Sequence, residues 1–439
     1  MKKNNMQSYN RTKYLIAFAL MLFLNINIDA QYRYEVKGGF LIGKIYPHCP
    51  NLKAIAKDKV KGGEIAFEIS ADGENEWQQF WRFPNVGIGL GAINLGNDQL
   101  LGNVIYAYPY VAIPFVDSRI FGLNLKIGTG ISYVTKTWAD GDTLNGVNAP
   151  TANGAFSSPI NCYITAGINT DIKITEQVSL YADIGLSHMS NGSFRNPNFG
   201  MNIYQSQMGI RYAFGRMYNR LVYNPAYGLP FDFEGKIVAS AFSRQVNFKD
   251  HQNYLVGSIH IGMTTPLTDW YAIGGGTDIF YDGIFTNRPT EHNPTFTKYL
   301  IEEDKITNKI KTGLSLNNEL IMGRVTGVID LGFYLYDPIR NRYADIKEKR
   351  GLFYKYDPSI EDGWSYFRLA LRYRVYDNFV LQIGVKSHIH KAEMLEVGIG
   401  YMLPFYRSKH ASISKKMHNY RLYHYDQREA PAYDTPWLR

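Results

Sequence analysis

Long apolar runs are missing after the first thirty residues of this 439-residue chain. A polytopic helical membrane protein needs several runs of about 20 apolar residues, so that class is excluded. Cysteine is also scarce, since only Cys49 and Cys162 are present, and they lack the spacing of metal ligands. Cys162 alternates with Ile160 and Ile164 on an apolar face, which favours a small hydrophobe over the alternative of a disulfide.

Aromatic and small residues are abundant instead. The chain has 34 Tyr and 40 Gly, 45% of its residues are hydrophobic, and its mean hydropathy is −0.26. Aliphatic and aromatic residues at this level argue against a disordered chain. The length alone would fit about three soluble domains. A polar average without long apolar runs is, however, also typical of a transmembrane β-barrel.

The N-terminus has the order of a secretory signal peptide. Basic residues precede an apolar run at 14–24, which is too short for a membrane helix, and Ala30 is a suitable cleavage residue. We therefore expect residues 1–30 to be a signal peptide. The formal net charge of +8 is partly contributed by this segment and is too weak to indicate a nucleic-acid partner.

After residue 30, apolar residues alternate with small or polar ones, as in barrel strands. We expect about sixteen strands in two sets of eight. The first set is expected near 32–46, 61–71, 77–96, 102–115, 120–135, 157–173, 178–190 and 202–214. The second set is expected near 233–246, 254–267, 269–282, 310–322, 325–336, 363–376, 379–389 and 392–404. Many strands exceed the roughly 9–11 residues that cross a bilayer, so the predicted fold is an all-β transmembrane antiparallel β-barrel.

The connections between the strands alternate in length. Short turns, as at 116–119 and 175–177, follow even-numbered strands, whereas long loops at 136–156, 283–309 and 337–362 follow odd-numbered ones. Outer-membrane barrels have short periplasmic turns and long extracellular loops. We therefore predict that the chain is located in the cell outer membrane.

A connector that contains Pro and Gly divides the strands eight and eight. The expected organisation is a signal peptide at 1–30, a first barrel half at 31–214, a connector at 215–232, a second half at 233–405 and a basic periplasmic tail at 406–439. Because the loop alternation continues across the connector, we favour one sixteen-stranded barrel. Two eight-stranded barrels are the alternative.

One hairpin places polar side chains on its lipid face. The apolar face of strand 178–190 continues to His188 and Ser190, and Asn202 begins the next strand on the same face as Tyr204. Side chains two apart on a strand point the same way, so His188 could take the proton of Ser190. Asn202 could then hold the other imidazole nitrogen. Polar side chains facing lipid are costly unless they have a use, although these could simply end the strand at the polar interface.

The hairpin resembles the active-site segment of the lipid A 3-O-deacylase family, which has an eight-stranded barrel with a Ser–His–acid triad on its lipid-facing wall. The residues that carry the resemblance are His188-Met189-Ser190-Asn191-Gly192 and Pro197-Asn198-Phe199-Gly200. The resemblance covers residues 32–214, and it implies Ser190 as the nucleophile and His188 as the general base. It also implies oxyanion-hole or substrate-positioning roles for Asn198, Asn191 and Gly192. The implied activity is hydrolysis of an acyl ester of lipid A, the lipid of lipopolysaccharide.

One position departs from that family, which has a glutamate where this chain has Asn202. Outer-membrane phospholipase A, a twelve-stranded barrel, is similar in another way, because it has His-x-Ser-Asn-Gly and an asparagine as its third triad member. That phospholipase uses calcium, with an arginine directly after Asn-Gly. Ser193 stands there in this chain, so we predict no metal and no cofactor. Both resemblances imply ester hydrolysis of a membrane lipid, lipid A or a phospholipid, through an acyl-enzyme intermediate.

The second half contains a partial repeat of the motif. Its segment Ile383-Gly384-Val385-Lys386-Ser387-His388 places Ser387 where His188 stands in the first half, and no serine follows in place. We therefore expect His388 and His390 to be structural or loop residues, and Asp278, Asp330 and Glu393 to be polar residues of the lumen or loops. A non-enzymatic pore or structural barrel with a decayed site is the alternative to an esterase. A homodimer stays open.

Overall fold

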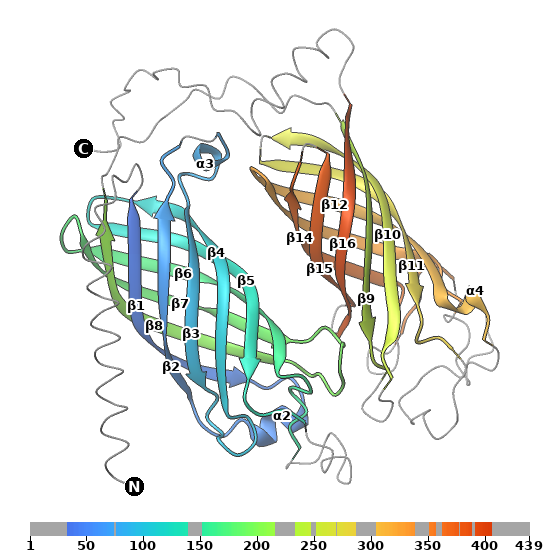
Figure 1. Ribbon diagram of the computed structural model, residues 1–439, viewed down its shortest axis with the longest axis horizontal. Coiled ribbons are helices and arrows are strands. Elements are labelled where there is room, and N and C mark those ends of the chain that lie inside the picture. Colours follow the sequence, from blue (N-terminus) through green and yellow to red (C-terminus); the bar gives the residue numbers. More distant parts are fainter. Residues whose placement is uncertain are drawn as a thin grey trace.

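The computed structural model contains two closed antiparallel barrels of eight strands each, lying side by side (Figure 1). The structure describes residues 33–73, 76–138, 152–215, 233–246, 252–268, 270–286, 304–338, 351–356, 362–376, 378–388 and 391–405. The expected signal peptide, nearly all of the expected connector, His390 and the expected tail lie outside the described residues.

The first barrel closes by pairing its last strand with its first. Its strands are β1 (Tyr34–Tyr46), β2 (Val60–Ser70), β3 (Asn85–Asn94), β4 (Asn103–Asp117), β5 (Phe121–Val134), β6 (Ile160–Lys173), β7 (Val178–Ser190) and β8 (Met201–Phe214). The β1–β8 register runs from Tyr34 opposite Phe214 to Tyr46 opposite Asn202.

The second barrel closes in the same way, with β9 between β10 and β16. Its strands are β9 (Phe233–Arg244), β10 (Tyr254–Thr268), β11 (Tyr271–Asp282), β12 (Ile310–Met322), β13 (Val325–Tyr336), β14 (Ser365–Arg374), β15 (Phe379–His388) and β16 (Lys391–Phe405). The all-β prediction of two eight-stranded halves is confirmed.

Our preference for one sixteen-stranded barrel is wrong. Both β8 and β16 pair with the first strand of their own half, so each half forms a complete ring. Ring closure gives every strand two neighbours, and this removes the open edges that cannot be satisfied in lipid. Loop alternation does not distinguish the two topologies, because both leave the connector on the short-turn side.

The turn between β2 and β3 also differs from the prediction. Residues 77–84 were expected to begin a strand, but Glu76–Phe80 form the short helix α3, and β3 begins only at Asn85. Two further short helices, α2 (Pro50–Ile55) and α4 (Ile306–Lys309), lie in the loops after β1 and β11. Among the described residues, none of the helices has the length and hydrophobicity to span a membrane.

The strand faces follow the predicted alternation. On β7, Leu180 and Ile184 are exposed on the outer wall, whereas Ser179, Tyr181 and Ser187 are buried in the lumen. Exposed apolar side chains surround both barrels, as expected of a wall that faces lipid. The prediction of outer-membrane-type barrels is therefore confirmed.

The lumen of the first barrel is filled by paired polar side chains. Glu64 accepts hydrogen bonds from the Tyr106 and Tyr108 hydroxyls at 3.0 and 2.9 Å and pairs with Lys126 at 3.1 Å. Arg211 pairs with Glu35 at 3.2 Å. An eight-stranded barrel is just wide enough for its interior to be filled by side chains. These contacts leave the outer wall as the accessible surface for chemistry.

Candidate active site

The β7–β8 hairpin brings the three predicted catalytic residues together. Antiparallel pairing places His188 directly opposite Asn202, and Ser190 follows His188 by two residues on the same face. His188 Nε2 lies 2.9 Å from Ser190 Oγ, and His188 Nδ1 lies 2.7 Å from Asn202 Oδ1. All three side chains are half-buried near the long-loop end of the outer wall.

This geometry fixes the tautomer of the imidazole. The amide oxygen of Asn202 can only accept a hydrogen bond, so His188 Nδ1 must carry the proton. The Nε2 atom is then free of a proton and can accept one from the Ser190 hydroxyl. The arrangement is that of a nucleophile, a base and a group that orients the base.

The hairpin loop, residues 191–200, lies beside this trio. The Asn198 side-chain oxygen accepts a hydrogen bond from the Asn191 amide at 3.1 Å, and Asn191 Nδ2 donates to Ser157 Oγ at 3.3 Å. The oxygen of the Asn198 carboxamide thus faces the loop, which leaves its NH₂ group as the donor. Asn191 therefore links the two ends of the hairpin loop through its bond to Asn198, and links the loop to the preceding one through its bond to Ser157.

Two loop glycines have left-handed backbone conformations, Gly192 with φ +59° and Gly200 with φ +68°. A Cβ at Gly200 would lie 3.0 Å from His188 Cε1 and 3.2 Å from Ser190 Cβ. Glycine is therefore needed at position 200, both for its backbone conformation and to leave room for the imidazole.

Sequence reasoning missed His48, which follows β1. Asn202 Nδ2 donates to His48 Nδ1 at 3.3 Å, so the exposed imidazole of His48 holds the amide with its oxygen toward His188. His48 reaches the site because β1 pairs with β8, where Tyr46 lies opposite Asn202.

The cysteines take no part in a disulfide, because both Cys49 and Cys162 are free thiols. Cys162 is paired across the sheet with Ser190, and Ile164 is paired with His188. The neighbouring strand β6 therefore contributes small and apolar side chains next to the polar trio. This agrees with the prediction of Cys162 as a hydrophobe on the outer face.

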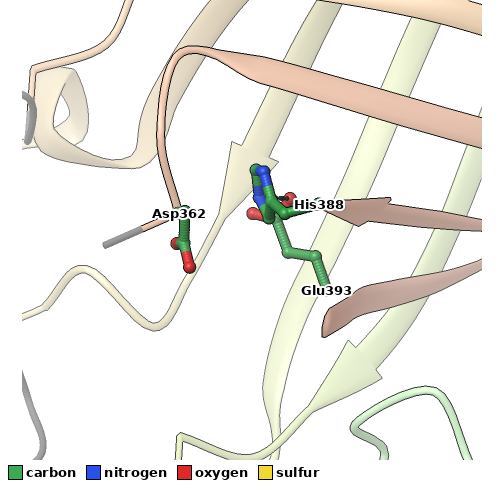
Figure 2. A group of neighbouring side chains, drawn as sticks. All are labelled: Asp362, His388 and Glu393. Atoms are coloured by element: carbon green, nitrogen blue, oxygen red, sulfur yellow. Dashed lines mark hydrogen bonds and ion pairs between the residues drawn. The ribbon is translucent and has the colours of Figure 1, made fainter. Parts of the chain in front are cut away.

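The second barrel gathers Asp362, His388 and Glu393 near its long-loop end, with one potential ligand atom from each within 4.8 Å of the others (Figure 2). His388 Nδ1 donates to the Ser365 carbonyl, and His388 Nε2 lies 2.9 Å from Glu393. Glu393 also pairs with the cations Lys386, Arg244 and Lys311. This positive surrounding already compensates the carboxylates, so an ion-pair network explains the group better than a metal site.

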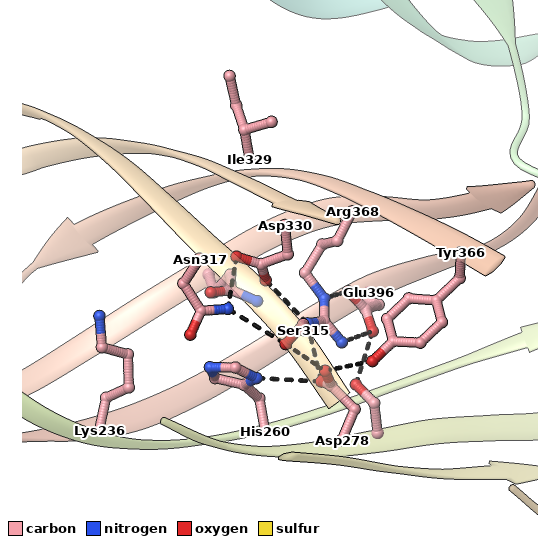
Figure 3. A network of polar contacts seen from close by, with 12 residues as sticks. Lys236, His260, Asp278, Ser315, Asn317, Ile329, Asp330, Tyr366, Arg368 and Glu396 are labelled. Carbon is pink, nitrogen blue, oxygen red and sulfur yellow. Dashed lines mark hydrogen bonds and ion pairs between the residues drawn. The ribbon is translucent and has the colours of Figure 1, made fainter. Parts of the chain in front are cut away.

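A second group in the same lumen contains a histidine, an aspartate and a serine without triad geometry (Figure 3). Asp278 accepts from His260 Nδ1 at 3.0 Å and from the Ser315 hydroxyl at 2.8 Å, so the serine bonds to the acid rather than to the imidazole. Arg368 pairs with Asp278 at 2.9 Å and Asp330 at 3.0 Å. Asp278, Asp330, Glu393 and His388 are all buried, and for the three acids this agrees with the lumen side of the expected choice between lumen and loop.

Known families match each barrel separately. Residues 61–211 match the family model described as Lipid A 3-O-deacylase (PagL), and residues 233–406 match that described as acyloxyacyl hydrolase, C-terminal domain. Among curated proteins, none matches the sequence.

Several solved barrels align with part of the chain. Neisserial surface protein A is 9% identical with a TM-score of 0.28, covering 41% of this chain and 97% of that one. The outer membrane enzyme PagL is 13% identical with a TM-score of 0.26, covering 41% and 99%. Ail, the attachment invasion locus protein of Yersinia pestis, is 9% identical with a TM-score of 0.25, covering 42% and 100%. From the two family matches, the resemblance to the lipid A 3-O-deacylase family is confirmed over the first barrel, and the second barrel matches a C-terminal domain of acyloxyacyl hydrolases.

Proposed function

We propose that the protein is an outer-membrane serine esterase that removes an acyl chain from lipid A. The observation that carries this proposal is the position of His188, whose two ring nitrogens lie 2.9 Å from Ser190 Oγ and 2.7 Å from Asn202 Oδ1. The match of the first barrel to the lipid A 3-O-deacylase model supports the substrate class. The position of the trio on a lipid-facing wall suits a substrate whose acyl chains stay in the bilayer.

The reaction proceeds through an acyl-enzyme. Ser190 Oγ attacks the ester carbonyl carbon while its proton passes to His188 Nε2. The bond to the sugar oxygen then breaks, and His188 returns the proton to that leaving oxygen. A water molecule attacks the acyl-enzyme and gives a proton to His188, which restores it to Ser190 as the fatty acid is released.

The hairpin loop supplies candidates for stabilising the oxyanion. The carboxamide of Asn198 is oriented by its bond to the Asn191 amide, so its NH₂ group is the side-chain donor. Within the described residues, the backbone amide of Gly192 has no acceptor, which makes it a candidate for the second donor. We assign Asn191 the role of positioning Asn198, because the backbone N–H of Asn191 already donates to the Asn198 side chain and cannot also bind the oxyanion.

Asn202 favours a second substrate class, because an asparagine in the third position is also the arrangement of outer-membrane phospholipase A. Hydrolysis of a phospholipid would use the same three side chains and the same steps. The two substrates are distinguished by supplying each of them separately to one enzyme preparation.

The test is to compare wild type with Ser190→Ala in detergent, using purified lipid A and a diacyl phospholipid. We expect wild type to release fatty acid from lipid A and to be labelled by a serine-reactive fluorophosphonate, and Ser190→Ala to do neither while keeping its barrels folded. Release from the phospholipid alone would select the second class. A wild type that neither reacts with the probe nor hydrolyses either lipid would overturn the proposal.

A further inference from the structure

The loop of the catalytic hairpin contacts the second barrel through hydrogen bonds to Gln245. Gln245, just after β9, donates its amide to the Ser193 carbonyl at 3.0 Å. The Asn196 amide donates to Gln245 Oε1 at 2.9 Å, and Asn196 Nδ2 donates to the Gln245 carbonyl at 2.9 Å. Gln245 therefore bonds to both ends of the segment 193–196.

Other groups of the second barrel extend this contact. The Ser193 hydroxyl donates to the Ala392 carbonyl of β16 at 2.9 Å, and the rings of Phe194 and Phe242 lie 5.6 Å apart. Ser193 is buried although it lies in the loop of a hairpin. Both polar groups of Ser193 are therefore hydrogen-bonded to the second barrel, its hydroxyl to Ala392 and its carbonyl to Gln245, as buried polar groups require.

The remaining part of the loop is held by the first barrel itself. The amides of Phe199 and Gly200 donate to the carbonyls of Gly154 and Ala155, each at 3.1 Å. Asn198 lies between the segment 193–196, which the second barrel holds, and residues 199–200, which the first barrel holds. Its position thus depends on both barrels.

The two barrels are also joined at the opposite, short-turn end. Trp81, after α3, donates its indole N–H to the Ile321 carbonyl at 2.9 Å, and its ring lies 5.5 Å from that of Trp270 (Figure 1 shows α3 between the barrels). Contacts at both ends of the barrels limit their relative rotation. The contact at Trp81 is remote from Ser190 along the strands and provides a control for the contact at Gln245.

We propose that the second barrel is a positioning partner of the active site, and that Gln245 is its positioning residue. By holding residues 193–196, Gln245 keeps the Asn198 carboxamide aimed at the carbonyl oxygen of the ester that Ser190 attacks, where negative charge develops. This inference rests on the proposed esterase function, and it gives a role to the second ring, whose described residues include no Ser–His–Asn trio like that of the first. Small displacements of a positioned group cost about 100-fold in rate, so the effect is expected on kcat.

The experiment uses the full-length protein in detergent. Gln245→Ala removes the acceptor of the Asn196 amide, Gln245→Glu keeps an oxygen there, and Trp81→Phe loses one inter-barrel hydrogen bond at the other end. Hydrogen exchange of residues 193–198 and deacylation of purified lipid A are measured on each. Gln245→Ala should lose protection at Asn196 and lower kcat by about 10- to 100-fold with KM changed less than about twofold.

The two controls and the two readouts separate the outcomes. Gln245→Glu should recover most of kcat, and Trp81→Phe should match wild type in both measurements. Unchanged protection of Asn196 in Gln245→Ala, or lost protection with wild-type kcat, would overturn the positioning role. If wild type hydrolyses no lipid while protection still depends on Gln245, the esterase proposal fails and the structural contact stands.

Discussion

His188 and Asn202 occupy directly opposed positions on β7 and β8, with 2.7 Å between Nδ1 and Oδ1. An amide in this place orients the imidazole as a carboxylate would, but it brings no negative charge to stabilise the imidazolium that forms during attack. The third position of the proposed triad therefore contributes through geometry alone.

Two substitutions of Asn202 distinguish orientation of the His188 imidazole from electrostatic stabilisation of the imidazolium. Asn202→Ala should lower kcat for lipid A deacylation by about 100-fold or more, because the imidazole loses the acceptor that fixes its tautomer. Asn202→Asp should keep or exceed the wild-type kcat, since a carboxylate accepts the same hydrogen bond and stabilises the imidazolium. Steady-state release of fatty acid checks both variants. Wild-type activity in Asn202→Ala would remove Asn202 from the triad.

The role of His48 can be isolated in a double-mutant cycle. His48→Ala should lower kcat by about threefold, because the Asn202 amide loses the acceptor that keeps its oxygen toward His188. In an Asn202→Asp background the same change should have little effect, since a carboxylate presents an oxygen in either orientation. The cycle is measured by deacylation of lipid A, with Lys44→Ala, at an exposed position on β1, as the control. Additive effects would contradict the assigned role.

The hairpin was predictable from the sequence because it depends on local information. Strand alternation and the hairpin connection of consecutive strands fix which side chains share the lipid face, and these two features place His188, Ser190 and Asn202 together. The structure agrees closely here, with β7 at Val178–Ser190 as expected and β8 beginning at Met201.

Ring closure was not predictable in this way. Alternation describes the faces of a strand but does not reveal which distant strand it pairs with. The wrong preference for one barrel and the omission of His48 have the same cause, because His48 approaches Asn202 only when β1 closes onto β8. The resembled family has a barrel that closes after its eighth strand. That resemblance was the signal that could have indicated both the separate barrels and the contact of His48 with Asn202. The contact of Gln245 with the hairpin loop likewise depends on how two rings lie side by side, which no local pattern encodes.

The lumen of the second barrel should be sensitive to loss of Arg368. Its guanidinium pairs with Asp278, Asp330 and Glu396 at 2.9, 3.0 and 2.6 Å. Arg368→Leu leaves these buried carboxylates uncompensated, and removal of one partner from a buried network costs about 3–5 kcal/mol of unfolding free energy. Urea unfolding in micelles, followed by tryptophan fluorescence, measures the change.

The control for that measurement is an ion pair near the surface. Lys173 and Asp117 lie 2.7 Å apart but are both partly exposed, so Lys173→Leu should cost only about 0–1 kcal/mol. Equal losses in the two variants would mean that the lumen network contributes no more than a solvated pair.

Substitution of Gly192 tests whether the second barrel lies against the loop of the catalytic hairpin in the active protein. A Cβ at this position would lie 2.5 Å from Leu395 Cγ on the outer face of β16, and the residue has a φ of +59°. Gly192→Ala should therefore displace the loop and lower kcat by about tenfold, through both the clash and roughly 1–2 kcal/mol of backbone strain.

The clash can be removed without changing the first barrel. Leu395→Ala alone should leave kcat near wild type, because Leu395 belongs to the second barrel and none of the assigned catalytic roles uses its side chain. Combined with Gly192→Ala it should restore part of the lost activity, since the clash disappears while the backbone strain remains. Ile399→Ala, on the same outer face of β16 but 67% exposed, should restore nothing when combined in the same way. Deacylation rates of wild type and these four variants are compared. If Leu395→Ala rescues Gly192→Ala no better than Ile399→Ala does, the second barrel does not contact the loop in the working enzyme.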